Sequence, residues 1–297
     1  MTRDDFQHAD RPVISLVVLD FDDTLYDWIG HFMPALDAMI EAAAPLLGAA
    51  TADLRDQLKA VHERRGNTEH PFALLETASA QARFGHLPRA EQKEALASAF
   101  AAFDRVRAEK LKLYDDVDPA LARLRSDGVA IVGYSAATSV NIAKRVKMLG
   151  LGGSFDRIYA APYAGMPYPG HGSRTADDPA IIELARSKPD PHAVARITAD
   201  MGVAPESTLF VGDSIASDIA PAVQGGAKAA LIRRDSGSVS EWLPGLLDVS
   251  HRHAETRADS AGFSDEALSQ TPTMLTLDRL WDHFSFGSPK TLPVRLG

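Results

Sequence analysis

Three aspartates follow an apolar run near the start of the chain, in the stretch VISLVVLDFDDTL (residues 13–25). Residues 13–19 are almost wholly apolar and rich in β-branched types, which predicts a strand of a parallel sheet covered on both faces. Asp20 and Asp22 lie two positions apart, so they project to the same side if the extended chain continues. Crowded carboxylates repel each other, and this arrangement is typical of sites that hold a cation or perform acid–base chemistry. The alternative is that Asp22 and Asp23 form a turn that ends the strand.

Four more polar side chains stand at the ends of other predicted strands or before predicted helices. Ser135 follows the apolar run VAIVGY, and Asp213 follows STLFVG, with Asp218 five residues later. Because the carboxyl ends of parallel strands meet at one edge of a sheet, we expect these side chains to lie beside the first aspartates. Lys188, in SKPDP, comes just before a predicted helix, a setting that suits an anion. Carboxylates fit Mg²⁺, and a lysine with a hydroxyl fits a phosphoryl group.

The second part of the chain predicts the sheet that positions these residues. From about residue 117, helical patterns and short apolar strands alternate, which favours an α/β fold with a parallel sheet and helices on both faces. The predicted strands after the first are VAIVGYS, DRIYA, STLFVGD and AKAALIR, and TMLTLDRLWDHF predicts a last short strand and helix. Residues 162–179 and 235–272 are predicted to be long connections.

Residues 29–110 differ from the rest of the chain and predict helices only. They are rich in Ala, Leu, Glu, Gln and Arg, with apolar residues at helical spacing. The four predicted helices are HFMPALDAMIEAAAPLL, TADLRDQLKAVHERR, FALLETASAQARF and AEQKEALASAFAAFDRVRAEKLK. Short connections between them indicate a small bundle, inserted after the first strand of the sheet. The expected division is therefore an α/β core of residues 1–26 and 114–297, with an all-helical domain of residues 27–113.

Composition narrows the classes of partner. The chain has 297 residues, 45% of them hydrophobic, and its 31 basic and 40 acidic side chains give a net charge of −9, which argues against nucleic acid as the main partner. The absence of cysteine excludes disulfides, thiolate metal sites and a thiol nucleophile. No segment resembles a secretory signal or a membrane span, so a cytoplasmic protein with no membrane partner is expected. The oligomeric state stays open.

The motifs resemble those of the haloacid dehalogenase-like (HAD) hydrolases. DFDDTL is similar to the first motif of that family, Ser135 stands where the family has a Ser or Thr at a strand end, Lys188 in KPDP matches its lysine motif, and GDSIASD (residues 212–218) matches its last motif. The four motifs occur in the family's order between residues 14 and 218. Ala136 departs from the pattern, which has Asn after the hydroxyl residue. The helical insertion resembles the family's C1-type cap, and the core its Rossmann-like domain.

The resemblance implies a role for each acidic residue of the first motif. Asp20 would attack phosphorus to form an aspartyl-phosphate. Asp22 would protonate the leaving oxygen and then take a proton from the hydrolytic water. Mg²⁺ would be held by the Asp20 carboxylate, the Asp22 backbone carbonyl and Asp213. Thr24 would support the turn.

The remaining motif residues are implied to handle the phosphoryl group. Ser135 and Lys188 would bind its oxygens, and Asp218 would orient the metal shell or Lys188. Because dehalogenases of the family lack an aspartate at the position of Asp22, the resemblance favours a phosphatase that acts on a small phosphorylated metabolite. A phosphotransferase or phosphomutase of the same family remains the alternative, and a non-catalytic binding protein on this fold is a third possibility.

Some polar residues outside these motifs are candidates for substrate recognition. They lie in the polar segment of residues 62–67, at the end of the second predicted helix, and in the loop of residues 161–178, and each has a solvated surface as its alternative interpretation. They are Arg64, Arg65, Tyr163, His171 and Arg174. His251, His253 and Glu255 lie close together in sequence, but they fall in a connection without helix or strand signals, so no metal site is expected there.

Overall fold

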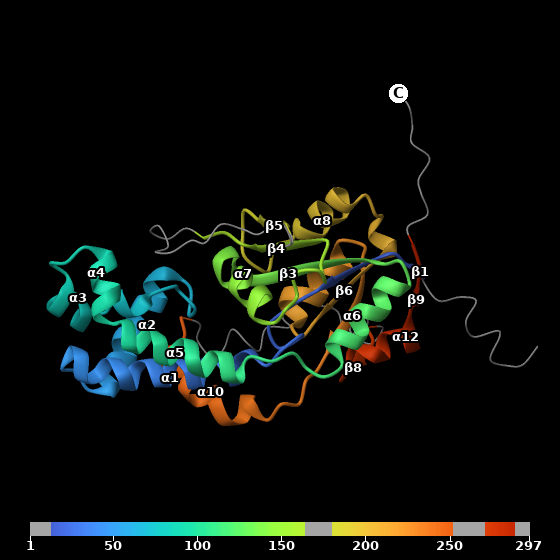
Figure 1. The fold of residues 1–297 in the computed structure, drawn as a ribbon. Coiled ribbons are helices and arrows are strands. Elements are labelled where there is room, and N and C mark those ends of the chain that lie inside the picture. Colours follow the sequence, from blue (N-terminus) through green and yellow to red (C-terminus); the bar gives the residue numbers. More distant parts are fainter. Residues whose placement is uncertain (1–12, 164–179, 252–270, 289–297) are drawn as a thin grey trace, which may run out of the picture.

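A computed structural model describes residues 13–163, 180–251 and 271–288 of the chain (Figure 1). Its centre is a seven-stranded parallel sheet with the order β5-β4-β3-β2-β6-β7-β8, which confirms the predicted fold class. The strands are β2 (Leu16–Leu19), β3 (Ala130–Thr138), β4 (Arg157–Ala161), β5 (Ala180–Glu183), β6 (Thr208–Gly212), β7 (Lys228–Ile232) and β8 (Thr273–Met274). A second small sheet pairs β1 (Val13–Ile14) with β9 (Ser285–Phe286).

Helices cover both faces of the large sheet because the strand residues are apolar on both faces. Val17 and Leu19 of β2 belong to one hydrophobic cluster, and Leu16 and Val18 belong to another on the opposite face. The first cluster includes side chains of α6 (Val117–Ser126), α7 (Ser139–Met148) and α12 (Leu280–His283), with the 3₁₀ turn η5 (Leu277–Arg279). The second includes α8 (Ala193–Met201), the π-helical turn η3 (Ile215–Ile219) and α9 (Ala220–Gln224). The short 3₁₀ turn η2 (Pro205–Ser207) leads into β6.

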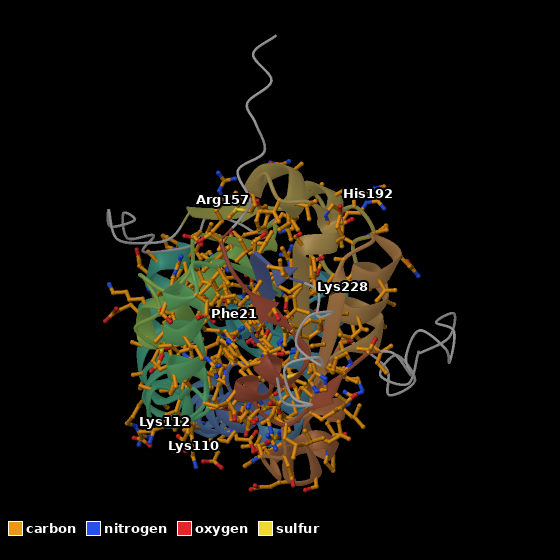
Figure 2. All side chains as sticks on the ribbon, turned by 90° about the vertical axis from the view of Figure 1, so that its right-hand side faces the viewer. Phe21, Lys110, Lys112, Arg157, His192 and Lys228 are labelled. Carbon is orange, nitrogen blue, oxygen red and sulfur yellow. The ribbon has the colours of Figure 1, made fainter. Side chains whose placement is uncertain are left out.

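The central strand continues past its last apolar residue into the first motif. The backbone N–H of Asp20 donates to the carbonyl of Val211 (2.9 Å), so Asp20 still lies in register with β6. The ring of Phe21 then lies over Gly133 of β3, where an added Cβ would come within 2.4 Å of it. Phe21 is fully buried in the interior of the molecule, whereas Lys110 and Lys112, near the return from the helical domain, lie at its edge (Figure 2). The ladder with β6 and the packing of Phe21 on Gly133 thus position the first motif at the end of β2.

The helical domain lies to one side of the sheet (Figure 1). It comprises α1 (Trp28–Leu47), α2 (Thr51–Arg65), the 3₁₀ turn η1 (Ala73–Glu76), α3 (Ala78–Phe84), α4 (Arg89–Ala95) and α5 (Ala97–Lys110). The third and fourth predicted helices are each divided in two, at Thr77 and Leu96. Thr77 is extended, and its hydroxyl accepts from the N–H of Ala80 (3.3 Å), so it begins a new helix. No single described helix is long and apolar enough to span a membrane, although α1 and α2 pass that test together as a pair bent by 111°.

Two elements of the structure fall within or beside the predicted long connections. β5 is a short edge strand, and α10 (Ser238–Val249) lies in the stretch that we expected to be irregular. Leu246 and Val249 of α10 are buried in the hydrophobic cluster of α1 and α2. This helix therefore extends the core of the helical domain, although it lies far from residues 27–113 in sequence. The division of the chain at residues 26/27 and 113/114 stays a prediction.

Candidate active site

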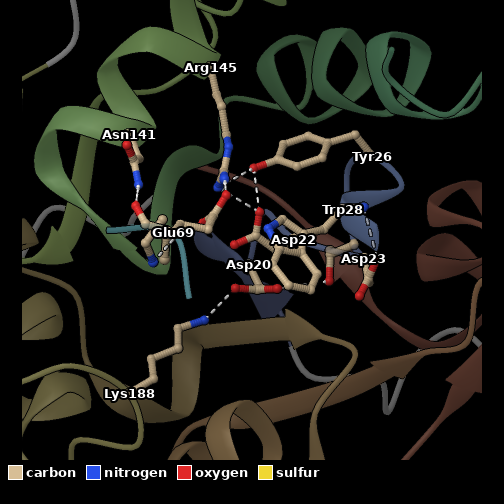
Figure 3. A network of polar contacts seen from close by, with 12 residues as sticks. Asp20, Asp22, Asp23, Tyr26, Trp28, Glu69, Asn141, Arg145 and Lys188 are labelled. Carbon is tan, nitrogen blue, oxygen red and sulfur yellow. Dashed lines mark hydrogen bonds and ion pairs between the residues drawn. The ribbon is translucent and has the colours of Figure 1, made fainter. Parts of the chain in front are cut away.

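The residues of the four motifs meet at the carboxyl edge of the sheet. Asp20 follows β2, Ser135 lies in β3, and Asp213 follows β6. Lys188 lies in the segment between β5 and α8, and its ammonium group reaches Asp20 (Figure 3). Asp218 lies in η3, directly after β6. The expected proximity is therefore observed for Asp20, Lys188, Asp213 and Asp218, whereas Ser135 is buried in β3 and does not line the cavity that Asp20 and Lys188 share.

Lys188 provides a buried positive charge in this site. Its Nζ donates to Oδ1 of Asp20 and to Oδ1 of Asp218, both at 2.6 Å, and only 5% of the residue is exposed. The ammonium group also lies 4.2 Å from the centre of the Tyr134 ring. Although burial opposes its charge, the carboxylates of Asp20 and Asp218 raise the pKa of Lys188. The side chain is thus a fixed, permanently charged cation at the base of the site.

Three carboxylates cluster beside this ammonium group. Oxygens of Asp20, Asp213 and Asp218 lie within 4.8 Å of one another. Burial raises the pKa of Asp20, and the carboxylates of Asp218 and Asp213 raise it further against the opposing effect of Lys188. Burial and the neighbouring Asp218 likewise raise the pKa of Asp213 to about 7. Arg233, which donates to the backbone carbonyl of Asp213, opposes this rise. Lys188 and Arg233 together do not balance three carboxylates, so the residues present fit an additional divalent cation with oxygen ligands.

Gly212 of the last motif has a steric role in this cluster. A Cβ at this position would lie 2.4 Å from the carboxyl carbon of Asp218. The same carboxylate accepts from the N–H of Ser214 (3.1 Å) with its second oxygen. Asp218 is therefore held on both sides, between Lys188 and the turn after β6.

The side chain of Asp22 lies outside the three-carboxylate cluster. Its Oδ1 accepts from the hydroxyl of Tyr26 (2.6 Å) and from Nη1 of Arg145 (2.9 Å). The carboxylate lines the same cavity as Asp20 and keeps 24% of its side chain exposed. This position suits a group that exchanges protons with a bound molecule.

Two hydroxyl residues complete the motif set. The hydroxyl of Ser135 is buried and accepts from the N–H of Ala137 (3.0 Å). Thr24 donates from its hydroxyl to Oδ2 of Asp20 (3.2 Å). The backbone carbonyl of Thr24 accepts from Nε and Nη2 of Arg234, at 3.1 and 2.8 Å. Asp20 thus has a hydrogen-bond donor on each carboxylate oxygen.

The site opens into a cavity of about 830 Å³ between the sheet edge and the helical domain. Arg65 and Tyr163 contribute to its lining, as the sequence suggested for substrate recognition. Both Arg65 and Arg64, however, form ion pairs with Glu76, at 2.8 and 3.5 Å. His171 and Arg174 lie outside the described residues, as do His253 and Glu255. His251 also lines the cavity and hydrogen-bonds the hydroxyl of Thr68 (2.7 Å), and the one candidate metal cluster found among the described residues is that of the three aspartates.

The residues that surround Asp22 were not among the predicted site residues. They are Arg145, Glu69 and Tyr26. The sequence holds one signal for Arg145, because it lies between Ile142 and Val146 on the apolar side of α7, where a charged residue is unusual. No comparable signal marks Glu69, which reaches Arg145 through the tertiary fold alone.

Comparison with known proteins agrees with this geometry. A family model described as haloacid dehalogenase-like hydrolase matches residues 14–226. The chain belongs to the haloacid dehalogenase-like hydrolases. The match begins at the first strand and ends just after α9, so it includes all four motifs and the helical domain. HAD-like hydrolases with a related fold are found among solved structures. The HAD phosphatase of Thermococcus onnurineus has a TM-score of 0.53 at 20% identity, and the 2-haloacid dehalogenase of Pseudomonas syringae pv. Tomato 0.51 at 18%. Each comparison covers 91% of this chain and 97% of the other.

Two relatives similar in sequence are both named glyceraldehyde 3-phosphate phosphatase. The one from Methanopyrus kandleri is 26% identical over 226 residues, which are 75% of this chain and 85% of the relative. The one from Methanothermobacter thermautotrophicus is 23% identical over 227 residues, which are 75% of this chain and 87% of the relative. This chain is an enzyme of the same hydrolase family.

Proposed function

We propose that this HAD-like hydrolase is a Mg²⁺-dependent phosphatase that releases phosphate from a small phosphorylated metabolite through an aspartyl-phosphate. One observation carries the proposal. A buried lysine joins Asp20 and Asp218 beside a third carboxylate, at the base of a cavity that also contains Asp22. Nucleophile, phosphoryl-binding cation and acid are thus available to a single substrate.

In the first step, a carboxylate oxygen of Asp20 attacks phosphorus and the bond from phosphorus to the leaving oxygen breaks. Lys188, which already lies 2.6 Å from Asp20, holds the phosphoryl oxygens near this carboxylate, and the Ser135 hydroxyl binds another of them. Asp22 gives its proton to the leaving oxygen, so the alcohol departs neutral.

In the second step, water attacks the phosphorus of the aspartyl-phosphate. Asp22, now ionised, takes the proton from that water, and the bond between phosphorus and Asp20 breaks. Phosphate leaves, and the carboxylate of Asp20 and the proton on Asp22 are restored. The overall reaction consumes one phosphate monoester and one water molecule.

Asp20, Asp213 and the backbone carbonyl of Asp22 are the groups that we propose to hold Mg²⁺, with Asp218 positioned behind them by Lys188. When bound, Mg²⁺ would offset the repulsion between the Asp20 carboxylate and the phosphate dianion. The excess of carboxylates over cations and the raised pKa of Asp213 support this assignment. The names of the two relatives make glyceraldehyde 3-phosphate the first substrate to test.

The proposed reaction is tested by measuring phosphate release with and without Mg²⁺. The substrates are an aryl phosphate and a panel of small phosphorylated metabolites that includes glyceraldehyde 3-phosphate. We expect release that requires Mg²⁺ and that is faster for one class of metabolite than for the rest. Transfer of the phosphoryl group to an added alcohol, without net phosphate release, would instead favour the phosphotransferase alternative.

The pKa of Asp213 predicts how Mg²⁺ binding depends on pH. Because the folded chain binds a proton at Asp213 more tightly than the unfolded chain does, the free energy of unfolding of the Mg²⁺-free protein should fall as pH rises from about 4 to about 7. Mg²⁺ needs the ionised carboxylate, so the increase in melting temperature caused by Mg²⁺ should be larger at pH 8 than at pH 6. Thermal unfolding with and without Mg²⁺ measures both effects. In the Asp213→Asn variant the Mg²⁺-induced increase should be lost, and an equal increase at both pH values in the wild-type chain would contradict the assignment.

A further inference from the structure

Arg145 of α7 is buried and contacts two carboxylates at once. Only 3% of its side chain is exposed. Nη1 donates to Oδ1 of Asp22 (2.9 Å) and to the hydroxyl of Tyr26 (3.3 Å), and Nη2 forms an ion pair with Glu69 (Figure 3). None of these three partners is adjacent to Arg145 in sequence, so the contacts depend on how the two parts of the fold are joined.

The partners of Arg145 come from both sides of the cavity. Glu69 belongs to the helical domain, in the loop between α2 and η1. Its backbone carbonyl also accepts from Nδ2 of Asn141 (3.0 Å), one turn before Arg145 on α7. Tyr26 lies where the chain leaves the sheet, and it forms isolated bridges with Asp22 and with Leu113, where the chain returns. A single guanidinium thus connects the core, the helical domain and the link between them.

We propose that Arg145 is a positioning residue that aligns Asp22 for proton transfer when the helical domain rests on α7. This inference rests on the proposed function. The guanidinium is planar and its donors are fixed relative to one another, so the ion pair with Glu69 sets the direction in which Nη1 meets Asp22. Both side-chain contacts of Asp22 fall on Oδ1. Its other oxygen, Oδ2, is therefore the atom that exchanges a proton with the leaving group. When the loop that carries Glu69 moves away from α7, Arg145 keeps its contacts with Asp22 and Tyr26 but loses the ion pair that sets this alignment.

The proposal predicts an effect that depends on the leaving group. An alkyl phosphate needs a proton on its leaving oxygen, whereas 4-nitrophenyl phosphate has a leaving group that departs readily without one. In the Glu69→Gln and Arg145→Gln variants, kcat/KM for the alkyl substrate, which reports formation of the aspartyl-phosphate, should fall about 10- to 100-fold, because the alignment of the acid is lost. For 4-nitrophenyl phosphate, kcat/KM should change much less, because its leaving group needs no proton. The Glu69→Gln and Arg145→Gln effects should not add in the double variant, because both remove one alignment.

Two further variants separate positioning from general weakening of the structure. Lys144 is one residue from Arg145 on α7, and its ammonium group pairs with Asp104 of α5 (2.9 Å). Lys144→Gln thus breaks another contact between α7 and the helical domain without touching Asp22, and it should leave both rates unchanged. Arg145→Lys keeps a cation but loses the planar pair of donors, so it should recover the melting temperature more than the rate on the alkyl substrate.

Asp22→Asn supplies the reference for these results. If Asp22→Asn lowers kcat/KM equally for both substrates, Asp22 is not the acid, and the first step of the proposed function and this inference both fail. Suppose instead that the effect of Asp22→Asn on kcat/KM depends on the leaving group. If Arg145→Gln and Glu69→Gln then lower kcat/KM equally for both substrates, Arg145 has only a structural role. The same conclusion follows if Lys144→Gln lowers kcat/KM for the alkyl substrate as strongly as Arg145→Gln does. Either result overturns this inference and leaves the proposed function in place.

Discussion

Asp20→Asn is expected to abolish phosphate release. The amide has no anionic oxygen to attack phosphorus, so no aspartyl-phosphate forms, and removal of a nucleophile typically costs roughly 10⁴-fold or more in rate. Folding should survive the change, because burial and three neighbouring carboxylates already raise the pKa of Asp20, and Lys188 keeps Asp218 as a partner. Phosphate release at saturating substrate and the melting temperature of the same sample together measure the two effects.

A second variant of the same motif makes that loss of activity specific. The side chain of Asp23 accepts from the N–H of Trp28 (2.9 Å), and an amide oxygen can do the same, so Asp23→Asn should retain most of the activity. Equal losses in Asp20→Asn and Asp23→Asn would mean that the rate follows the total charge near the site. Substantial release by Asp20→Asn alone would contradict a covalent intermediate on this residue and favour direct attack by water.

Much of the site could be predicted from the sequence because several of its residues directly follow strands. An apolar strand that ends in a polar residue is a local pattern, and parallel topology brings such ends together wherever the strands lie in sequence. Asp20 and Asp213 therefore line one cavity in the structure, as the pattern indicated, and Ser135 is buried in the neighbouring strand β3. Lys188 does not follow a strand, so its place in the site was predicted from its position before a helix and from its match to the family's lysine motif. Its contacts with Asp20 and Asp218 agree with a place in the site.

The features that sequence did not show depend on contacts between distant segments. α10 contains Pro244 and Gly245, which indicate a break in a helix, yet its apolar side packs on α1 and α2 and stabilises it. β5 contains only a short apolar run, and an edge strand of this length has little signal of its own. Glu69 has no local feature that distinguishes it from a solvated acid, and its partner Arg145 lies 76 residues away.

Lys188→Met is expected to reduce both activity and stability strongly. Methionine has a similar length but no charge, so the phosphoryl oxygens lose their fixed cation, and the rate should fall by about 10²- to 10³-fold. The change also leaves Asp20 and Asp218 buried without their shared partner, and breaking a buried ion pair on one side typically costs about 3–5 kcal/mol. Without Lys188, the effect that lowers the pKa of Asp20 is lost, so this carboxyl will hold its proton to higher pH and be a weaker nucleophile.

The pH dependence of this destabilisation distinguishes lost charge from lost packing. Protonation removes the charge that Lys188 no longer balances, so the stability difference between wild type and Lys188→Met should shrink as pH falls from about 8 to about 5. A packing defect would give the same difference at every pH. Lys228→Met is a matched control, because Lys228 is exposed at the amino end of β7, at the opposite edge of the sheet, and its loss should change neither rate nor stability. If the stability difference between wild type and Lys188→Met is the same at every pH, the loss of stability comes from packing. Lys188 would then not stabilise the charges of Asp20 and Asp218, despite its 2.6 Å contacts with both.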